Sequence, residues 1–528
     1  MLKKLLYNTV NLVKFNFKKD MKKTIIWLLS IVLIVYLCAV YYLESGLTQG
    51  ELTIFLETFK NPAIVLICGA IPKGLPSFEL LFSIEMTLFL GITIAIMNIF
   101  FVASNTRQDE ENGRLELIRS LPTGRLSTLL SSVIQMLIIN VILALGLTLA
   151  LELSNISSTL AHSFHFGVTI GAFGFMFATI STIFAQVFRS NRSSTGAALA
   201  FLGLNFLIRG MTDIFNPNLS WLSPVAWIYK SEPLVNSYWL PILSMFLLSI
   251  FCLVISFHLN SLRDLDGSFF KPRAGKSTAS KSLVKPFGFV FHSNKTTYIS
   301  WIVAIILFAA TFGVVFSDFG NFLANNSFIQ TMFPGVAQEN LEEQFLTMMG
   351  NMCMVFTTIP VVILIGRLHA EEKTNRLENI LTKNISRHKI LWSYLIHAIF
   401  ASVLFTVLTI SAMYIASNKS VNFNEVTKIC CYFWSPCFFT LGLSILILGA
   451  LPKLFHLSWI IIGGSFFITY FSEMLRLPNY IKNLSPFYHV SEMLVNDSKI
   501  TPVLLLIALG LIFITLSFLF YRKRDINI

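Results

Sequence analysis

The sequence has little charge for its length and no motif of a catalytic centre. Only 12% of its 528 residues are charged, whereas soluble globular chains carry about 25%. The string nearest to a phosphate-binding loop, 274–277, has Phe270 where that loop needs its first glycine. No HExxH segment, serine-hydrolase order or paired-carboxylate motif is present. We therefore expect no catalytic residues, no enzyme activity and no cofactor bound to this chain.

Cysteine chemistry is also sparse. The chain has seven cysteines, and all but Cys68 lie in or beside apolar runs. No CxxC pair or His-Cys cluster has the spacing of metal ligands, and no disulfide framework is present. We expect the cysteines to be small packing residues and the chain to hold no metal.

Long apolar runs dominate the sequence. Hydrophobic residues make up 55% of the chain, and runs of about 20 apolar residues can each cross a membrane as a helix. Because these runs are continuous rather than alternating, a β-barrel is excluded. The sequence predicts an all-α polytopic membrane protein with twelve transmembrane helices, at 24–43, 81–103, 129–151, 164–188, 194–213, 239–260, 298–317, 346–366, 390–416, 429–450, 457–475 and 502–521.

The basic residues orient these helices. With the N-terminus in the cytoplasm, 30 of the 39 lysines and arginines fall in cytoplasmic segments, as the positive-inside rule requires. Both termini are then cytoplasmic. The net charge of +12 is accounted for by topology and by contact with anionic lipid head groups, so nucleic acid is not an expected partner.

Two basic segments precede predicted helices and have an amphipathic pattern. The first, 1–23, holds seven lysines interleaved with apolar residues at helical spacing. Such a pattern is typical of a helix that lies in the membrane interface. The segment 281–297 has a weaker version of it, and an ordinary basic flank is the alternative for both. The apolar run that follows residue 23 is too long for a cleaved signal peptide.

A charged segment occurs twice, at 109–125 and 371–387. The copies align without a gap at an offset of 262, and each follows one long apolar run and precedes another. Leu222-Ser223-Pro224 and Leu484-Ser485-Pro486 repeat at the same offset. Two six-helix halves in the same orientation, a parallel repeat, explain both observations. The aligned residues are Asp109 with Glu371, Glu110 with Glu372, Arg114 with Arg376, Leu115 with Leu377, Glu116 with Glu378, Ile118 with Ile380 and Arg125 with Arg387.

These features divide the chain into four parts. We expect an interfacial helix at 1–23, a first six-span half at 24–262, a cytoplasmic linker with a second interfacial helix at 263–297, and a second six-span half at 298–528. The ends of the halves also resemble each other, since Arg263-Asp264-Leu265 follows the sixth span and Arg524-Asp525-Ile526 follows the twelfth.

Polar and aromatic residues inside the spans are candidates for a transport path. An ionisable residue in lipid is a functional candidate by default, and Glu85 is one. Phe82 and Phe89 lie on the same predicted span and could line a path for a hydrophobic substrate. Lipid-facing and packing roles are the alternative for these phenylalanines.

The charged segments carry a family resemblance. A long span, a D/E-E-x-x-x-R-L-E segment, then L-x-x-x-P-x-x-R and a third span resemble the coupling-helix region of ABC type-2 permeases. Two such halves on one chain, joined by LRDLDGSFFKPRAG, resemble the permeases that export polyketide antibiotics of the tetronasin and narasin ionophore type. The second copy departs from the pattern at Asn375 and Asn384, where the first has Gly113 and Pro122.

The resemblance implies roles for named residues. It implies that two copies of a separate ATPase subunit, carrying ATP and magnesium, bind the charged segments, and that the Ser-Pro element forms an outer re-entrant cap. The implied ATPase-coupling residues are Asp109, Glu110, Glu111, Arg114, Glu116, Arg125, Glu371, Glu372, Arg376, Glu378 and Arg387. The implied cap residues are Ser223, Pro224, Ser485 and Pro486.

The function expected from this resemblance is ATP-driven export of a hydrophobic small molecule, an ionophore, polyketide antibiotic or other drug, through a multi-pass protein of the bacterial cytoplasmic membrane. Two alternatives remain at this stage. An ion-coupled secondary transporter would need Glu85 and no ATP. A membrane scaffold or sensor would bind a cytoplasmic partner and transport nothing.

Overall fold

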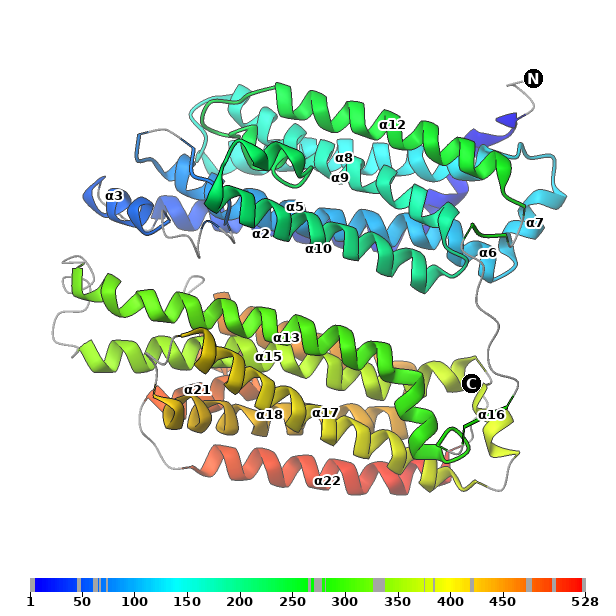
Figure 1. Cartoon of the computed structure of the whole chain (residues 1–528), viewed down its shortest axis with the longest axis vertical. Coiled ribbons are helices and arrows are strands. Elements are labelled where there is room, and N and C mark those ends of the chain that lie inside the picture. The colour runs from blue at the N-terminus through cyan, green and yellow to red at the C-terminus, as the bar shows by residue number, and fades with distance from the viewer. Residues whose placement is uncertain are drawn as a thin grey trace. The chain divides into compact units, whose positions relative to one another are not determined.

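The computed structural model folds into two compact units, Met1–Ala274 and Gly275–Ile528, and each is described by itself (Figure 1). The structure describes residues 5–44, 49–59, 65, 68–72, 75–264, 267–269, 278–280, 282–325, 338–374, 376–382, 385–417, 422–471, 477–495 and 500–524. In these residues every regular element is a helix. The expectation of an all-α polytopic membrane protein is confirmed.

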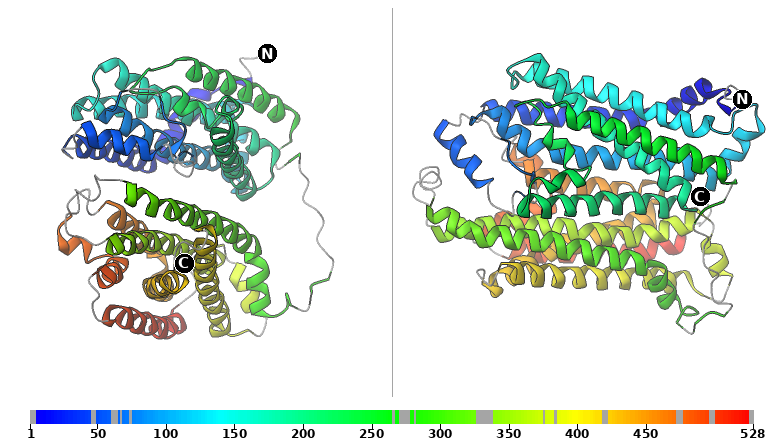
Figure 2. Two further views of the ribbon diagram at one scale, coloured as in Figure 1. Left: turned by 60° about the vertical axis from the view of Figure 1, so that its left-hand side comes forward. Right: turned by 45° about the horizontal axis from the view of Figure 1, so that its top comes forward.

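The first unit is a bundle of long helices with short ones at its ends. The long helices are α2 (Thr9–Glu44), α5 (Phe78–Ala103), α8 (Ser127–Ser154), α9 (Leu160–Val187), α10 (Asn191–Phe215) and α12 (Leu240–Leu262). The short elements are α3 (Gln49–Thr58), η1 (Ser104–Gln108), α6 (Asp109–Glu111), α7 (Arg114–Ser120), η2 (Leu219–Leu222) and α11 (Trp227–Lys230). Both views of Figure 2 show the long helices running side by side.

Helix α9 is the centre of this unit because small residues let its neighbours approach closely. In its most apolar stretch 83% of the residues are buried. A Cβ at Gly167 would lie 2.3 Å from the Ala144 carbonyl oxygen of α8. A Cβ at Gly174 would lie 2.5 Å from Ile94 of α5. Glycine therefore sets the helix spacing here, as small residues commonly do between membrane helices.

The second unit has the same all-helical character. Its elements are α13 (Pro286–Asn325), α15 (Gln338–Lys373), α16 (Arg376–Leu381), α17 (Arg387–Ala416), α18 (Phe423–Ala450), η3 (Pro452–Leu454), α19 (Leu457–Phe471), α20 (Asn479–Lys482), α21 (Pro486–Val495) and α22 (Thr501–Lys523). Helix α15 is the most buried, and α18 packs along α22 through glycines. A Cβ at Gly442 would lie 2.6 Å from the Gly510 carbonyl oxygen.

Eleven of the described helices are long and apolar enough to cross a membrane, against twelve expected from the sequence. The difference lies at the eleventh expected span, 457–475. Helix α19 covers 15 residues of it, about 22 Å at 1.5 Å per residue, and 472–476 lie outside the described residues. The number of spans and their parallel repeat remain predictions.

The two segments expected to be interfacial helices are continuous with the helices that follow them. Helix α2 begins at Thr9 and runs through the apolar stretch to Glu44, and α13 begins at Pro286. The polar side of α2 faces the protein, because Asn16 donates to Ser131 at 3.3 Å and Asp20 is buried. Whether 1–23 lies in the interface stays a prediction.

Candidate functional site

The first charged segment forms a sharp helical corner beyond the second span. Helix α5 continues as a π-helix, η1, then as α6, and the chain turns at Gly113 into α7. Gly113 has φ +71°, a left-handed conformation that costs a side-chain-bearing residue about 1–2 kcal/mol. No atom lies within 4 Å of a Cβ placed there. The requirement for glycine is therefore conformational rather than steric.

The second charged segment has a related arrangement. Helix α15 ends at Lys373, and α16 and α17 follow. Asn375 and Asn384, where the two copies differ, lie outside the described residues. Ser386 caps α17 by accepting a hydrogen bond from the Lys389 amide at 3.4 Å. Each copy thus places one short helix, α7 or α16, between two long ones.

Each short helix has one buried anchor and an exposed charged face. Leu115 of α7 is 8% exposed and Leu377 of α16 is 1% exposed. Glu116 and Glu378, the next residues, are exposed. Leu117 of α7 is 71% exposed. These charged faces are open to solvent in each unit.

The acidic residues at the helix ends face inward instead. Asp109 accepts a hydrogen bond from Lys19 of α2 at 2.6 Å and one from Arg114 at 3.2 Å. Its counterpart Glu371 lies 3.8 Å from Arg376. The Lys19–Asp109 pair ties the first charged segment to α2. Arg114 and Arg376 remain exposed.

Glu110 forms the centre of a buried ion-pair cluster. It accepts two hydrogen bonds from the Arg263 guanidinium, both at 3.0 Å, and one from Arg107 at 3.2 Å. Arg107, only 1% exposed, also donates to the carbonyls of Gln186 and Gly267 at 3.2 and 3.1 Å. Arg263 lies directly after α12. Paired, charge-assisted bonds of this kind are the strong ones.

Glu372 has the equivalent position in the second unit. It accepts a hydrogen bond from Arg524 at 2.6 Å and one from the Tyr521 hydroxyl at 2.9 Å. Arg524 directly follows α22, and its guanidinium also donates to the Leu448 carbonyl of α18. We call the Glu110–Arg263 and Glu372–Arg524 pairs the first and second clasps.

One further arginine reinforces each clasp. Arg125 donates to the backbone carbonyl of Arg263 at 2.9 Å, and Arg387 donates to that of Arg524 at 2.9 Å. Arg125 and Arg387, which are aligned in the repeat, therefore both donate to the backbone carbonyl of the clasp arginine in their own unit. Around the first clasp the charge is mainly positive. Burial lowers the pKa of Arg119. Glu110 raises this pKa, and the neighbouring Arg125 and Arg263 lower it.

The structure thus divides the eleven residues predicted to contact an ATPase. Asp109, Glu110, Glu371 and Glu372 are buried, and they hold the segments in place. Arg387 is half-buried, and Glu111, Arg114, Glu116, Arg125, Arg376 and Glu378 are exposed. Glu111 accepts a hydrogen bond from the Asn191 amide at the start of α10 at 2.9 Å.

Sequence reasoning missed the basic partners in the clasps. Arg107, Arg263 and Arg524 were not among the candidate residues. A signal was present, because Arg263-Asp264-Leu265 and Arg524-Asp525-Ile526 end the two halves in the same way. Nothing in the sequence shows that this element meets the charged segment about 150 residues earlier.

The expected outer cap of the first unit lies next to a buried ion pair of α10. Ser223 donates to the Asn205 carbonyl of α10 at 2.8 Å, and Pro224 follows it. Nearby on α10, Arg209 donates to Asp213 at 3.4 Å, and both side chains are 0% exposed. The Tyr229 hydroxyl donates to Asp213 at 2.6 Å.

Arg209 and Asp213 were also missed, although both lie in the predicted span 194–213, where two charges four residues apart signal a functional or structural pair. In the second unit Ser485 is 1% exposed and Pro486 begins α21.

The residues proposed to line a path are not equivalent. Phe82 is fully buried and packs edge-on against Tyr42, 6.0 Å between ring centroids. The Tyr42 hydroxyl donates to Glu85, which is half-buried. Phe89 is 51% exposed on the outside of the same helix. Only Phe82 and Glu85 share an interior environment.

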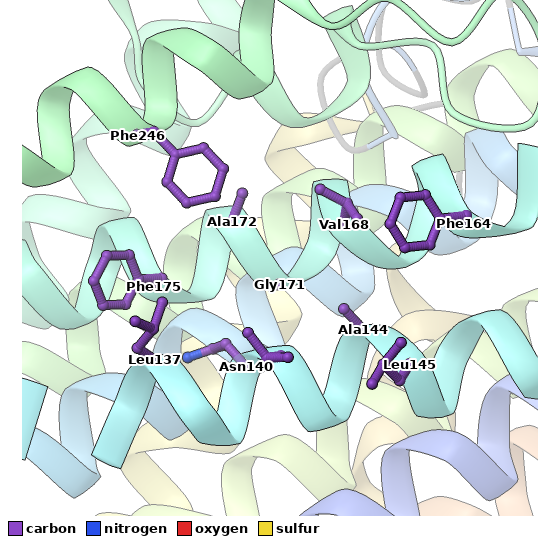
Figure 3. Close-up of a pocket in the computed structure, with 11 residues that line it drawn as sticks. Leu137, Asn140, Ala144, Leu145, Phe164, Val168, Gly171, Ala172, Phe175 and Phe246 are labelled. Carbon is purple, nitrogen blue, oxygen red and sulfur yellow. The ribbon is translucent and has the colours of Figure 1, made fainter. Parts of the chain in front are cut away.

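A hollow of about 220 Å³ lies between α8, α9 and α12. Figure 3 shows Phe246 of α12 above Ala172 and Phe175 of α9, with Leu137 and Asn140 of α8 opposite. Its one side-chain amide is engaged elsewhere, because Asn140 donates to Asn98 at 2.7 Å and to the Met136 carbonyl at 2.8 Å. The hollow therefore presents an apolar surface.

Taken together, long apolar helices packed through glycines, with charged corners at their ends, define a multi-pass protein of the cell membrane. In the part of the chain that the structure describes, no cluster of three or more His, Cys, Asp or Glu side chains is placed to hold a metal ion.

Comparison with known proteins refines this class. Residues 283–522 match the family model described as the C-terminal domain of the multidrug efflux system permease Rv1217c. The multidrug efflux system permease protein Rv1217c of Mycobacterium tuberculosis (strain ATCC 25618 / H37Rv) is 28% identical over 440 residues, which is 82% of this chain and 80% of the relative. The chain is therefore similar to a permease, a transport protein rather than a catalyst.

Proposed function

We propose that this chain is the transmembrane permease subunit of an ATP-driven exporter, and that a separate ATPase subunit supplies the energy. The observation that carries the proposal is the paired short helices, α7 and α16, each with a buried leucine anchor and an exposed acidic residue. The similarity to a multidrug efflux permease supports export of a drug.

The exposed faces are suited to protein docking. Leu117 and Leu121 of the first segment are 71% and 60% exposed, and charged residues surround them. An apolar centre with a charged rim is the common anatomy of a protein interface. Because each segment presents an exposed acidic residue, Glu116 in the first and Glu378 in the second, the stoichiometry we propose is two copies of the ATPase subunit for one permease.

In this proposal the ATPase subunits hold ATP and magnesium, and this chain holds no cofactor. The two halves, 24–262 and 298–528, have the same orientation and each receives one ATPase subunit. Closure of the ATPase pair moves α7 and α16, and the movement opens the path outward past the caps that contain Ser223-Pro224 and Ser485-Pro486. The cargo we propose is a hydrophobic compound of the ionophore or polyketide class.

The experiment is purification of the intact permease from membranes of its source cells, followed by identification of bound chains and efflux measurements. We expect a co-purified chain with a Walker A motif, at about two copies per permease, and efflux that stops when cellular ATP is depleted while the proton gradient is kept. Efflux that follows the proton gradient and ignores ATP would contradict the proposal.

A cargo test follows from the same material. Ionophores and polyketides are compared with hydrophilic antibiotics for the resistance that expression of the permease confers. We expect resistance to the first group only. Equal resistance to both groups, or to neither, would contradict the proposed cargo class.

A further inference from the structure

We infer that Arg263 and Arg524 are positioning residues that fasten each coupling segment to the last helix of its own unit. This inference rests on the proposed function, because the movement it transmits begins at the ATPase. Neither arginine is exposed enough to serve as a docking residue, with side chains 6% and 13% exposed.

The first step of the argument is that both clasps join the same two elements. In the first unit, Glu110 follows the second long helix, and Arg263 follows α12. In the second unit, Glu372 belongs to the last turn of α15, and Arg524 follows α22. Two independent occurrences in one chain argue against a chance contact of flexible surface side chains.

The second step is that each clasp resists separation. Glu110 and Glu372 have side chains 5% and 0% exposed, so separating either pair would take a buried carboxylate from its arginine. Glu110 would keep the bond from Arg107, and Glu372 the bond from Tyr521. The arginine is also held through its backbone carbonyl by Arg125 or Arg387. A displacement of α7 or α16 is therefore passed to α12 or α22 rather than absorbed at the joint.

The third step is that each carboxylate has a second donor of a different kind. Arg107 donates to Glu110 at 3.2 Å, and a tyrosine has this role in the second clasp. Three residues before the clasp arginine, the first unit has Asn260 and the second has Tyr521. The Tyr521 hydroxyl donates to Glu372 at 2.9 Å, adding a hydrogen bond to the carboxylate. Asn260 instead donates to the Gln186 side chain at 3.0 Å.

A small cavity lies at the first clasp. Its volume is about 20 Å³, and Asn105, Glu110, Arg119, Asn260 and Arg263 are among the residues that line it. In both clasps the arginine Nε has no hydrogen-bond partner among the described residues, Arg263 Nε in the first and Arg524 Nε in the second. The two joints are alike in this respect, and each carboxylate has a second donor besides its clasp arginine.

The test measures the joints directly, on the permease alone in lipid nanodiscs. Spin labels are placed at Leu117 and Leu262 for the first joint, and at Glu378 and Leu519 for the second, after Cys68 and Cys431, the two cysteines that are not buried, are replaced by serine. Dipolar EPR then reports the distribution of distances within each pair. We expect one narrow distribution for each pair.

Variants separate fastening from simple folding. Arg263→Gln and Arg524→Gln should broaden only the distribution of their own unit, and Arg263→Lys should broaden it less, because lysine keeps the charge but not the two-pronged geometry. Tyr521→Phe should broaden the second distribution, because it removes one hydrogen bond to Glu372. Size-exclusion profiles of all variants are recorded to show that they remain folded.

Efflux in cells tests the transmission. Arg263→Gln and Arg524→Gln should lower ATP-dependent efflux by about tenfold or more, while the co-purified amount of ATPase stays that of the wild type. Loss of ATPase binding, or unchanged efflux beside a broadened distribution, would overturn the transmission role. Unchanged distributions in folded Gln variants would overturn the clasps themselves.

The two proposals fail in different ways. The EPR measurement contains no ATPase, so its result does not depend on what supplies the energy for transport. If efflux proved independent of ATP, the proposed function would fall even where the distance distributions behaved as expected.

Discussion

Tyr521 donates a hydrogen bond to Glu372 at 2.9 Å, although the two residues are 149 positions apart in the chain. Through this bond α22, the last helix of the second unit, is attached to the end of α15. Since Glu372 is aligned with Glu110, and Glu110 is bound by Arg263, the charged segments repeat a tertiary arrangement as well as a sequence.

The exposed acidic residues should decide partner binding. We expect the double variant Glu116→Lys and Glu378→Lys to lower ATPase co-purification and drug efflux by about tenfold or more, because like charges replace opposite ones at the docking faces. Co-purification quantified by mass spectrometry, together with efflux, is the measurement. Glu425→Lys is the control, since Glu425 is exposed at the start of α18, on the predicted outer side. Equal losses in both variants would refute the docking faces.

The turn at Gly113 should tolerate asparagine better than valine. Gly113 has φ +71°, and asparagine populates this region far more readily than a β-branched residue. We expect Gly113→Asn to retain most efflux and Gly113→Val to lose stability by roughly 1–2 kcal/mol, with lower efflux. The apparent Tm of each detergent-solubilised variant is the measurement. Space is not limiting at this position, so a similar loss for both variants would contradict the conformational argument.

Breaking the buried pair on α10 should destabilise the first unit. Asp213→Asn leaves the Arg209 guanidinium without its carboxylate in a fully buried position, and such a change costs about 3–5 kcal/mol. We expect a lower apparent Tm and less folded protein in the membrane. The double variant Arg209→Met, Asp213→Leu removes both charges and should recover part of the loss. If the double variant were the less stable of the two, the ion pair would not be the cause.

Glu85 should not be needed to supply the energy for transport. Glu85→Gln keeps an oxygen that can accept the Tyr42 hydrogen bond but removes the titratable group. We expect efflux within about twofold of the wild type, a difference of roughly 0.4 kcal/mol, and continued dependence on ATP. Efflux is measured at several external pH values, with Phe89→Leu as a control on the exposed side of the same helix. Complete loss in Glu85→Gln alone would favour an ion-coupled mechanism.

Much of the fold could be predicted because a membrane restricts what a sequence can do. Apolar runs must be helical where no water can satisfy the backbone, and the basic residues set the orientation. The predicted span with the least support from the structure is 457–475, where the described helix is only 15 residues long. Apolar length alone does not distinguish a spanning helix from a shorter one that packs within the protein.

The candidate site was predicted in part. The charged segments could be located from their repeat, and Glu116 and Glu378 are exposed as a docking role requires. The same pattern gave no sign that Glu110 and Glu372 face inward, since a charge beyond a span end is ordinarily solvated. Arg107 was not among the candidates because it lies in an ordinary basic flank. Arg263 and Arg524 were noted only as matching ends of the two halves.

The sequence by itself determined the class of protein, the places where helices run and the two charged corners, because these depend on local hydropathy and charge. Only the tertiary structure decided which charges meet. Glu110 and Arg263 are 153 positions apart, and no local rule relates them. Their pairing follows from how α5 and α12 end at the same side of the first unit, which is a property of packing rather than of either segment.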